Sequence, residues 1–218
     1  MSQDHDASGM SSATESEALS AKRAAELLEE TKRRAQREFD VWPPYLLLIG
    51  AVIFLVGYGA VWWSVRGQDP FTGPTGGALA VMYGGILAWI IVSVQVIQRA
   101  TTGIRGSTSR SRTYGAGYFA IIVGYSAFQG ALYHAGASHA IVYGIYPASA
   151  PWLFAGSVFV TIAALREDWR PLGLGVILIG IGLGAAYAGP VASWLVSGIG
   201  IFVMLTGFAA IQAARRRA

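Results

Sequence analysis

Four stretches free of acidic and basic residues follow Asp40, and they are 25, 29, 53 and 44 residues long. A helix that spans a bilayer needs about 20 apolar residues, so the first two stretches each hold one span and the last two each hold two. Backbone groups in a bilayer must be paired within their own segment, which predicts helices. The predicted fold class is therefore all-α, a polytopic membrane protein with six transmembrane helices over 44–212 and an N-terminal cytoplasmic helix. The predicted spans are 44–65, 77–98, 114–134, 149–165, 171–188 and 191–212.

Polar and charged residues dominate the two ends of the chain. Residues 1–13 are rich in Ser, Asp and Ala, which predicts a disordered tail. Thr14 and Glu17 have the spacing of a capping box, which predicts a charged cytoplasmic helix over 14–40. Three roles stay open for this helix: a solvated support for membrane insertion, a short coiled coil, and a helix on the inner leaflet. Residues 213–218 form a basic cytoplasmic tail.

The basic residues indicate how the spans are oriented. If the N-terminus is cytoplasmic, fifteen Lys and Arg residues lie on the cytoplasmic side and Arg66 alone lies outside. Such an excess is typical of the inner side of a membrane protein, so we expect both termini in the cytoplasm. Arg outnumbers Lys in an Ala- and Gly-rich chain, which favours a bacterial cytoplasmic membrane. The basic residues flank apolar segments, so they indicate topology and not nucleic-acid binding.

Tryptophan positions add to this topology. Trp89 falls inside the second span, and indole is often buried with its N–H paired, so Trp89 is predicted to be a packed core residue. Four others fall near the predicted outer ends of spans, where indole rings form interfacial belts. These four are Trp62, Trp63, Trp152 and Trp194.

The composition excludes several classes of function. Only 13% of the residues are charged, about half the share found in soluble domains. The absence of Cys excludes disulfides, thiolate metal sites and Cys nucleophiles. The middle of each predicted span lacks ionisable residues, and the chain shows no carboxylate pair or nucleophile–base pair. We therefore expect a protein that is not an enzyme and has no cofactor or metal site.

Glycine carries the clearest pattern within the spans. Gly180 and Gly184 form a GxxxG motif in the fifth span, and Gly198 and Gly200 lie in the sixth. Small residues let helices approach closely where lipid provides no hydrophobic drive. These four glycines are helix-packing candidates, and we predict that spans five and six form one hairpin with a turn at Gly189-Pro190.

Three groups of polar residues are further candidates. Gln95 and Gln129 lie within spans, and each predicts an interhelical hydrogen bond, with the lining of a permeation path as the alternative. His134 and His139 lie in the predicted outer loop, where they are candidates for pH sensing because imidazole changes charge near neutral pH; a structural interfacial role is the alternative. The segment 166–170 is either a docking loop for a cytosolic partner or a local charge cluster that separates two spans. Its charged residues are Arg166, Glu167, Asp168 and Arg170.

Residues 171–217 resemble one hairpin unit of the HdeD family of short membrane proteins. That family repeats a Gly-rich helix, a Pro at the turn, a second Gly-rich helix and then basic residues. The segment 48–57 has a weaker version of this pattern, and the middle hairpin departs from it. The resemblance implies a membrane protein associated with acid resistance, and it lends no catalytic residue. The matching residues are Gly175, Gly180, Gly189, Pro190, Gly198, Gly200, Gly207, Arg215, Arg216 and Arg217.

Two functions stay open. The first is a non-enzymatic integral membrane protein, stress-related by its resemblance, that packs or oligomerises in the bilayer. The alternative is the membrane subunit (permease) of a small transport system energised by a separate ATPase, which six spans with cytoplasmic ends would suit. The expected partners are the lipid bilayer, a second copy of the chain, and a cytosolic partner bound through 14–40 or 166–170.

Overall fold

The computed structural model describes residues 43–100, 108–167 and 169–217, together with Arg23, Glu26 and Leu27. The predicted tail over 1–13 lies outside the described residues. Most of the predicted helix over 14–40 also lies outside them, although Arg23, Glu26 and Leu27 are helical.

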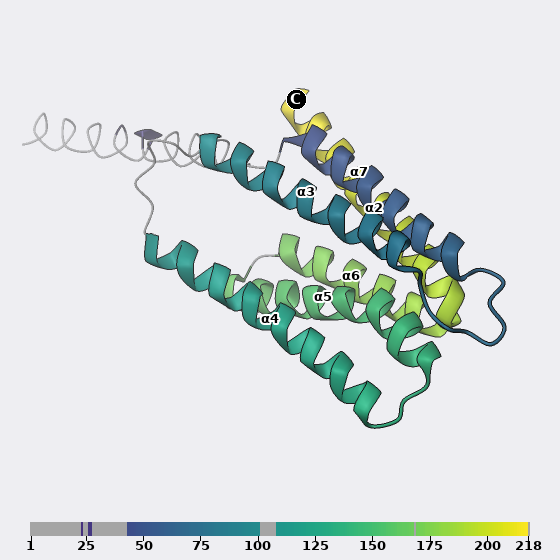
Figure 1. Cartoon of the computed structure of the whole chain (residues 1–218). Helices are drawn as coiled ribbons and strands as arrows, with labels where there is room; N and C mark the ends of the chain where they lie inside the picture. The colour runs from purple at the N-terminus through teal and green to yellow at the C-terminus, as the bar shows by residue number, and fades with distance from the viewer. Residues whose placement is uncertain (1–22, 24–25, 28–42, 101–107, 168, 218) are drawn as a thin grey trace, which may run out of the picture. The chain divides into compact units, whose positions relative to one another are not determined.

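The unit Pro44–Ala218 is helical over nearly all of its described residues, and none of these residues forms a strand. Successive helices run in opposite directions, so their connections lie alternately at the two ends (Figure 1). This confirms the all-α fold class. The elements are α2 (Pro44–Val65), α3 (Gly76–Ala100), α4 (Thr108–His134), η1 (Ala140–Ile145), α5 (Tyr146–Arg166), α6 (Trp169–Tyr187) and α7 (Gly189–Arg217).

Four helical segments of the described chain are long and apolar enough to cross a membrane. They are Pro44–Val65, Gly76–Val96, Ala140–Leu165 and Gly189–Ala214. The apolar part of α6, Pro171–Tyr187, is shorter. These helices fit an integral membrane protein, while the predicted spans in α4 and α6 stay predictions.

The helices pack as a chain of neighbours. α2 packs against both α3 and α7, and α6 packs against both α5 and α7. The described contacts of α4 are with α5 and η1, and they are few. Side chains of α2, α5 and α7 meet in the core, to which α3 and α6 also contribute.

An aromatic cluster fills this core. Trp194 of α7 is fully buried, and its ring centroid lies 5.7 Å from that of Tyr58 in α2. The Trp152 ring of α5 lies 5.5 Å from Phe54 and 5.9 Å from Tyr58. Aromatic pairs of this kind add about 0.5–1.5 kcal/mol each beyond their area burial. Trp152 and Trp194 thus point into the bundle, while their predicted depth at the outer rim stays a prediction, because sequence position gives depth along a helix but not the side on which a ring lies.

Trp89 occupies the predicted core position. Its indole N–H donates to the carbonyl oxygen of Leu46 at 3.0 Å, and its ring lies against Gly50, where an added Cβ would approach it to 2.8 Å. Trp63, in contrast, is exposed as expected for a rim residue, with the guanidinium carbon of Arg66 3.0 Å from its ring centroid. The indole ring that packs against Gly50 is thus internal, whereas the ring beside Arg66 is at the surface.

α5 and α6 approach each other closely through glycines on both helices. A Cβ added to Gly156 would lie 2.7 Å from the carbonyl oxygen of Gly175, and one added to Gly175 would lie 2.8 Å from the carbonyl oxygen of Gly156. One added to Gly182 would lie 2.8 Å from the Leu153 side chain. Backbone meets backbone here, which requires glycine on both helices.

The predicted hairpin of α6 and α7 is present. Gly189 joins the helices with a φ of 86°, a left-handed value that favours glycine. An added Cβ on Gly200 would lie 2.9 Å from Ile181, whereas one on Gly184 would make an ordinary 3.7 Å contact with Val196. Gly200 therefore lies at a closer contact between α6 and α7 than Gly184 does.

The other two predicted packing glycines have different surroundings. Gly198 faces α2, where an added Cβ would lie 2.8 Å from the Cβ of Tyr58. Gly180 is exposed, and an added Cβ there would meet nothing within 4 Å. The expectation that Gly180 packs against α7 is thus corrected for a single chain. The reason is rotational, since α6 turns Gly175 and Gly182 inward and leaves Gly180 outside.

Replacing Gly175 should therefore destabilise the fold. Gly175→Leu would force α5 and α6 apart, and we expect the free energy of unfolding to fall by about 1–3 kcal/mol. Unfolding in mixed detergent micelles, followed by Trp fluorescence, measures the change. Gly84→Leu is the matched control, because Gly84 is an exposed helical glycine with nothing within 4 Å of an added Cβ. Equal stability of the two variants would contradict the assigned contact.

Candidate functional site

The best-defined polar site surrounds the start of α5. Helix begins here at Ala140 with the π-helical turn η1, nine residues before the predicted start at 149. The loop between α4 and η1 is correspondingly shorter than predicted, and Tyr143 lies in the helix. Pro147 lies in the first turn of α5, where proline is well tolerated.

Gln129 supplies a hydrogen bond that Pro147 cannot make. The N–H of Tyr146 donates to the carbonyl of Ile141, which sets the five-residue spacing of η1. Continued by one residue, that spacing would pair residue 147 with the carbonyl of Val142, but proline has no N–H. Gln129 of α4 donates its amide Nε2 to this carbonyl oxygen at 2.9 Å. The predicted interhelical role of Gln129 is confirmed, whereas Gln95 is exposed on α3.

Two serines of α7 bind the same segment from the opposite side. The buried Ser197 hydroxyl donates to the carbonyl oxygen of Ala148 at 2.7 Å. The buried Ser193 hydroxyl shares its hydrogen between the carbonyl oxygens of Pro190 at 3.2 Å and Gly144 at 3.3 Å. An added Cβ on Gly144 would lie 2.6 Å from Pro190, so η1 and α7 are in close contact. Side chains of α4 and α7 therefore bond to two carbonyls of η1, those of Val142 and Gly144, and to one near the start of α5, that of Ala148.

Tyr146 completes the attachment of α4. Its ring stacks on Tyr125 with centroids 5.0 Å apart and planes 9° apart, and its hydroxyl donates to the Tyr125 carbonyl oxygen at 3.0 Å. The ring also lies 5.6 Å from Phe128. Together with Gln129, these contacts join the second half of α4 to α5 and η1. We call this set of residues, Tyr125, Phe128, Gln129 and Tyr146, the α4 clasp.

The two predicted pH-sensing histidines lie on an exposed aromatic row. His134 lies 5.8 Å from Tyr133, and His139 lies edge-on to Tyr143 at 5.4 Å. Tyr133 and Tyr143 are 6.3 Å apart. The structure therefore brings the histidines onto one surface but places tyrosines between them, and the pH-sensing role stays a prediction.

A second polar site, which sequence reasoning missed, organises the loop between α2 and α3. The Gln68 amide Nε2 donates to the carbonyl oxygens of Ser64 and Gly73 at 3.1 and 3.0 Å. Its Oε1 accepts from the backbone N–H groups of Thr72 and Gly73 and from the Thr72 hydroxyl, each at 3.1 Å. One side chain thus replaces the regular hydrogen bonds that this loop lacks. The signal was a lone Gln between Gly67 and a Pro-rich turn.

The predicted docking segment is a very short connection between helices. Arg166 ends α5, and Arg170 is the second residue of α6. Glu167 is exposed with a left-handed φ of 52° and donates its backbone N–H to the carbonyl of Ala163. Asp168 lies outside the described residues. The docking role therefore stays a prediction.

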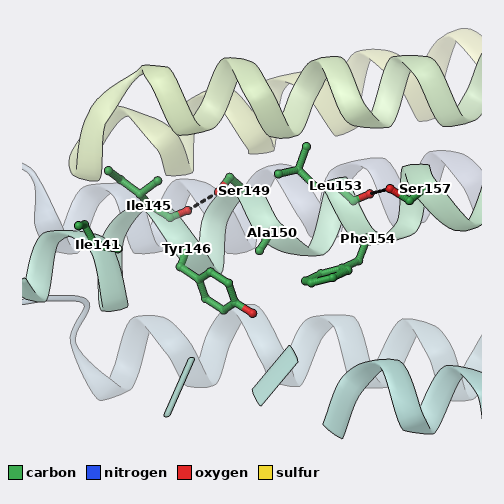
Figure 2. Close-up of a pocket in the computed structure, with 8 residues that line it drawn as sticks. All are labelled: Ile141, Ile145, Tyr146, Ser149, Ala150, Leu153, Phe154 and Ser157. Carbon is green, nitrogen blue, oxygen red and sulfur yellow. Dashed lines mark hydrogen bonds between the residues drawn. The ribbon is translucent and has the colours of Figure 1, made fainter. Parts of the chain in front are cut away.

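An open groove borders the α4 clasp along α5. Its volume is about 360 Å³, and Figure 2 shows the Tyr146 and Phe154 rings extending in the same direction with Ala150 between them. The Ser149 and Ser157 hydroxyls donate to carbonyl oxygens of their own helix. The groove consequently presents an apolar surface. Its lining consists of Ile141, Ile145, Tyr146, Ser149, Ala150, Leu153, Phe154 and Ser157.

Neither site has the composition of a metal centre. Among the described residues, no group of three or more His, Asp or Glu side chains could hold a metal ion. Comparison with family models, curated proteins and solved structures finds no match to this chain. The resemblance of 171–217 to the HdeD family accordingly stays an expectation that rests on glycine spacing.

The Gln129 hydrogen bond should contribute measurably to stability. Gln129→Met keeps the length of the side chain but leaves the Val142 carbonyl without its donor, so we expect a loss of about 1–2 kcal/mol in the free energy of unfolding. The same denaturation in mixed micelles measures it. Gln95→Met is the matched control on the exposed face of α3, and a similar loss in both variants would refute the assigned role.

Proposed function

We propose that this chain is a non-enzymatic integral membrane protein that packs against another membrane-spanning helix, with a second copy of itself as the simplest partner. One face of α6 carries the proposal. Gly180 and Gly184 are exposed there, together with the exposed apolar residues Val176 and Leu183. Because α6 uses other glycines inside the chain, this face is free to approach a second helix closely.

The interior supports a structural rather than a transporting role. Aromatic rings fill the meeting point of α2, α5 and α7, and the buried serines Ser193 and Ser197 donate to backbone carbonyls. The alternative, a permease subunit energised by a separate ATPase, rests on the predicted number of spans. The stress-related role rests on the resemblance to the HdeD family. The packing role is the one for which the described contacts argue.

Oxidative crosslinking tests the packing face, and the absence of native Cys removes any background. We expect Leu183→Cys to form a crosslinked dimer in membranes, and Gly180→Leu in the same chain to lower the yield several-fold by holding the helices apart. Gly84→Leu should leave the yield unchanged. A monomer at every protein concentration, or a dimer yield that Gly180→Leu does not change, would contradict the proposal.

We further propose that both termini lie in the cytoplasm of a bacterial cell. The support is the excess of basic residues on one side of the predicted spans. Asp69 lies in the loop after α2 and Trp169 begins α6, and both residues are exposed. The end of α2 and the start of α6 lie at opposite ends of the helices (Figure 1). A membrane-impermeant maleimide should label Asp69→Cys in intact cells and label Trp169→Cys only after permeabilisation. The reverse pattern would invert the topology.

A further inference from the structure

The end of α2 carries a cation that has no anionic partner. Arg66 directly follows the last residue of α2, and its backbone N–H donates to the carbonyl oxygen of Trp62 at 2.9 Å. Its side chain is exposed and forms no ion pair within the part of the chain that the structure describes. Asp69, the acidic residue nearest to it in the sequence, is exposed and forms no ion pair there either. The charge of Arg66 is therefore available to an anion from outside the chain.

Two indole rings hold the guanidinium group in place. Its carbon lies 3.0 Å from the ring centroid of Trp63 and 5.7 Å from that of Trp62. The two rings meet edge-to-face, with centroids 6.3 Å apart and planes at 68°. Trp62 is partly buried and packs against the core, so it attaches this group to the bundle. We call Trp62, Trp63 and Arg66 the α2 rim cluster.

Hydrogen bonds also fix the backbone on both sides of Arg66. The amide of Gln68 donates to the carbonyl oxygens of Ser64 and Gly73. The Ser64 hydroxyl in turn accepts from the backbone N–H of Thr75 at 3.4 Å. Because the surrounding chain is already ordered, binding at Arg66 costs little additional conformational entropy.

The α2 rim cluster offers hydrogen-bond donors that have no acceptor. A guanidinium group carries five N–H donors and each indole carries one. Among the described residues, none accepts a hydrogen bond from these side-chain N–H groups. The contact of Arg66 with the rings is a cation–π contact, which is electrostatic and supplies no acceptor oxygen. Phosphate oxygens match the planar donor set of a guanidinium group, so this chemistry favours a phosphate as the ligand.

The length of α2 places the cluster at the level of lipid headgroups. The helix has 22 residues and is one of the segments that are apolar enough to cross a membrane. It is about 33 Å long, slightly more than the hydrocarbon core of about 30 Å. A span of this length brings Arg66 to the lipid phosphates and brings Trp63, which is 61% exposed, to the interface where Trp is enriched.

We propose that the α2 rim cluster binds the phosphate of an anionic membrane lipid, with Arg66 as its ligand and Trp63 as the ring that positions Arg66. A lipid also covers the exposed surface of Trp63, which a free phosphate ion cannot do. This proposal requires α2 to span the membrane, and it is independent of the proposed packing face on α6.

Photolabelling in proteoliposomes tests the proposal. The probe is a phosphatidylglycerol with a diazirine on its headgroup glycerol, and mass spectrometry locates the attached label. We expect several-fold more label per residue over 62–68 than over 186–192. The second segment joins α6 to α7 at the same end of the helices and holds no charged residue (Figure 1). Equal labelling of both segments would overturn the proposal without any variant.

Variants of the cluster sharpen the test. Arg66→Gln removes the charge from an exposed position, so labelling of 62–68 should fall several-fold while stability in mixed micelles stays the same. Arg66→Lys keeps the charge without the planar donor set and should restore only part of the labelling. Trp169→Leu removes an exposed Trp at the start of α6 and should leave the labelling of 62–68 unchanged. Full labelling in folded Arg66→Gln would refute the site.

Competing ligands distinguish the possible sources of the phosphate. Unlabelled phosphatidylglycerol should displace the probe from 62–68, whereas a diacylglycerol with the same acyl chains, which lacks the phosphate, should not. Displacement by diacylglycerol would show that the phosphate is not recognised and would overturn the proposal. Displacement by inorganic phosphate at constant ionic strength would assign the site to a free anion and overturn the lipid as its ligand.

The lipid site and the packing face fail in different experiments. Loss of the Leu183→Cys crosslink with labelling of 62–68 intact would reject the packing face alone. A crosslink at Leu183 with no preference for labelling 62–68 would reject the lipid site alone.

Discussion

Side-chain hydrogen bonds to backbone carbonyls around the start of α5 are the constraint on which the centre of this structure depends. Each buried polar backbone group without a hydrogen bond costs several kcal/mol in hydrocarbon surroundings. Pro147 has no N–H to donate to the carbonyl of Val142, and Gln129 of α4 bonds to that carbonyl. Ser197 of α7 donates to the carbonyl of Ala148 in α5, and the Ser193 hydroxyl lies within hydrogen-bond distance of that of Gly144 in η1. Side-chain hydrogen bonds thus join two further helices to this segment, and the proline accounts for the one from α4.

Close approach is the second constraint, because lipid gives helices no hydrophobic reason to associate. The chain meets it in two ways. Between α5 and α6 the paired glycines Gly156 and Gly175 bring backbone against backbone. Between α2, α5 and α7 the large rings of Tyr58, Trp152 and Trp194 fill the space instead. Glycine therefore allows the close approach of α5 and α6, and aromatic side chains fill the space between α2, α5 and α7.

Much of the fold could be predicted from the sequence, because uncharged length alone marks the helices and Gly189 marks the hairpin turn. The sequence did not reveal which side of each helix faces the interior. Gly180 and Gly175 differ by five positions, so they lie on different sides of α6, and only packing decides which side is internal. The same limit affected Trp152 and Trp194. Gln129 was found because an amide within a span requires a partner, but its partner is a carbonyl exposed by a distant proline, which no local pattern reveals. Gln68 was missed because its partners lie in an irregular loop.

The helices also differ in how extensively they contact their neighbours. α2, α5, α6 and α7 contact neighbours along much of their length, whereas α4 is joined through the clasp near its end. A helix attached at one end leaves an apolar gap beside it, and hydrocarbon must fill that gap if the helix lies in a bilayer, since an empty apolar gap forfeits dispersion contacts on both walls. The weak packing of α4 and the groove along α5 are therefore one feature.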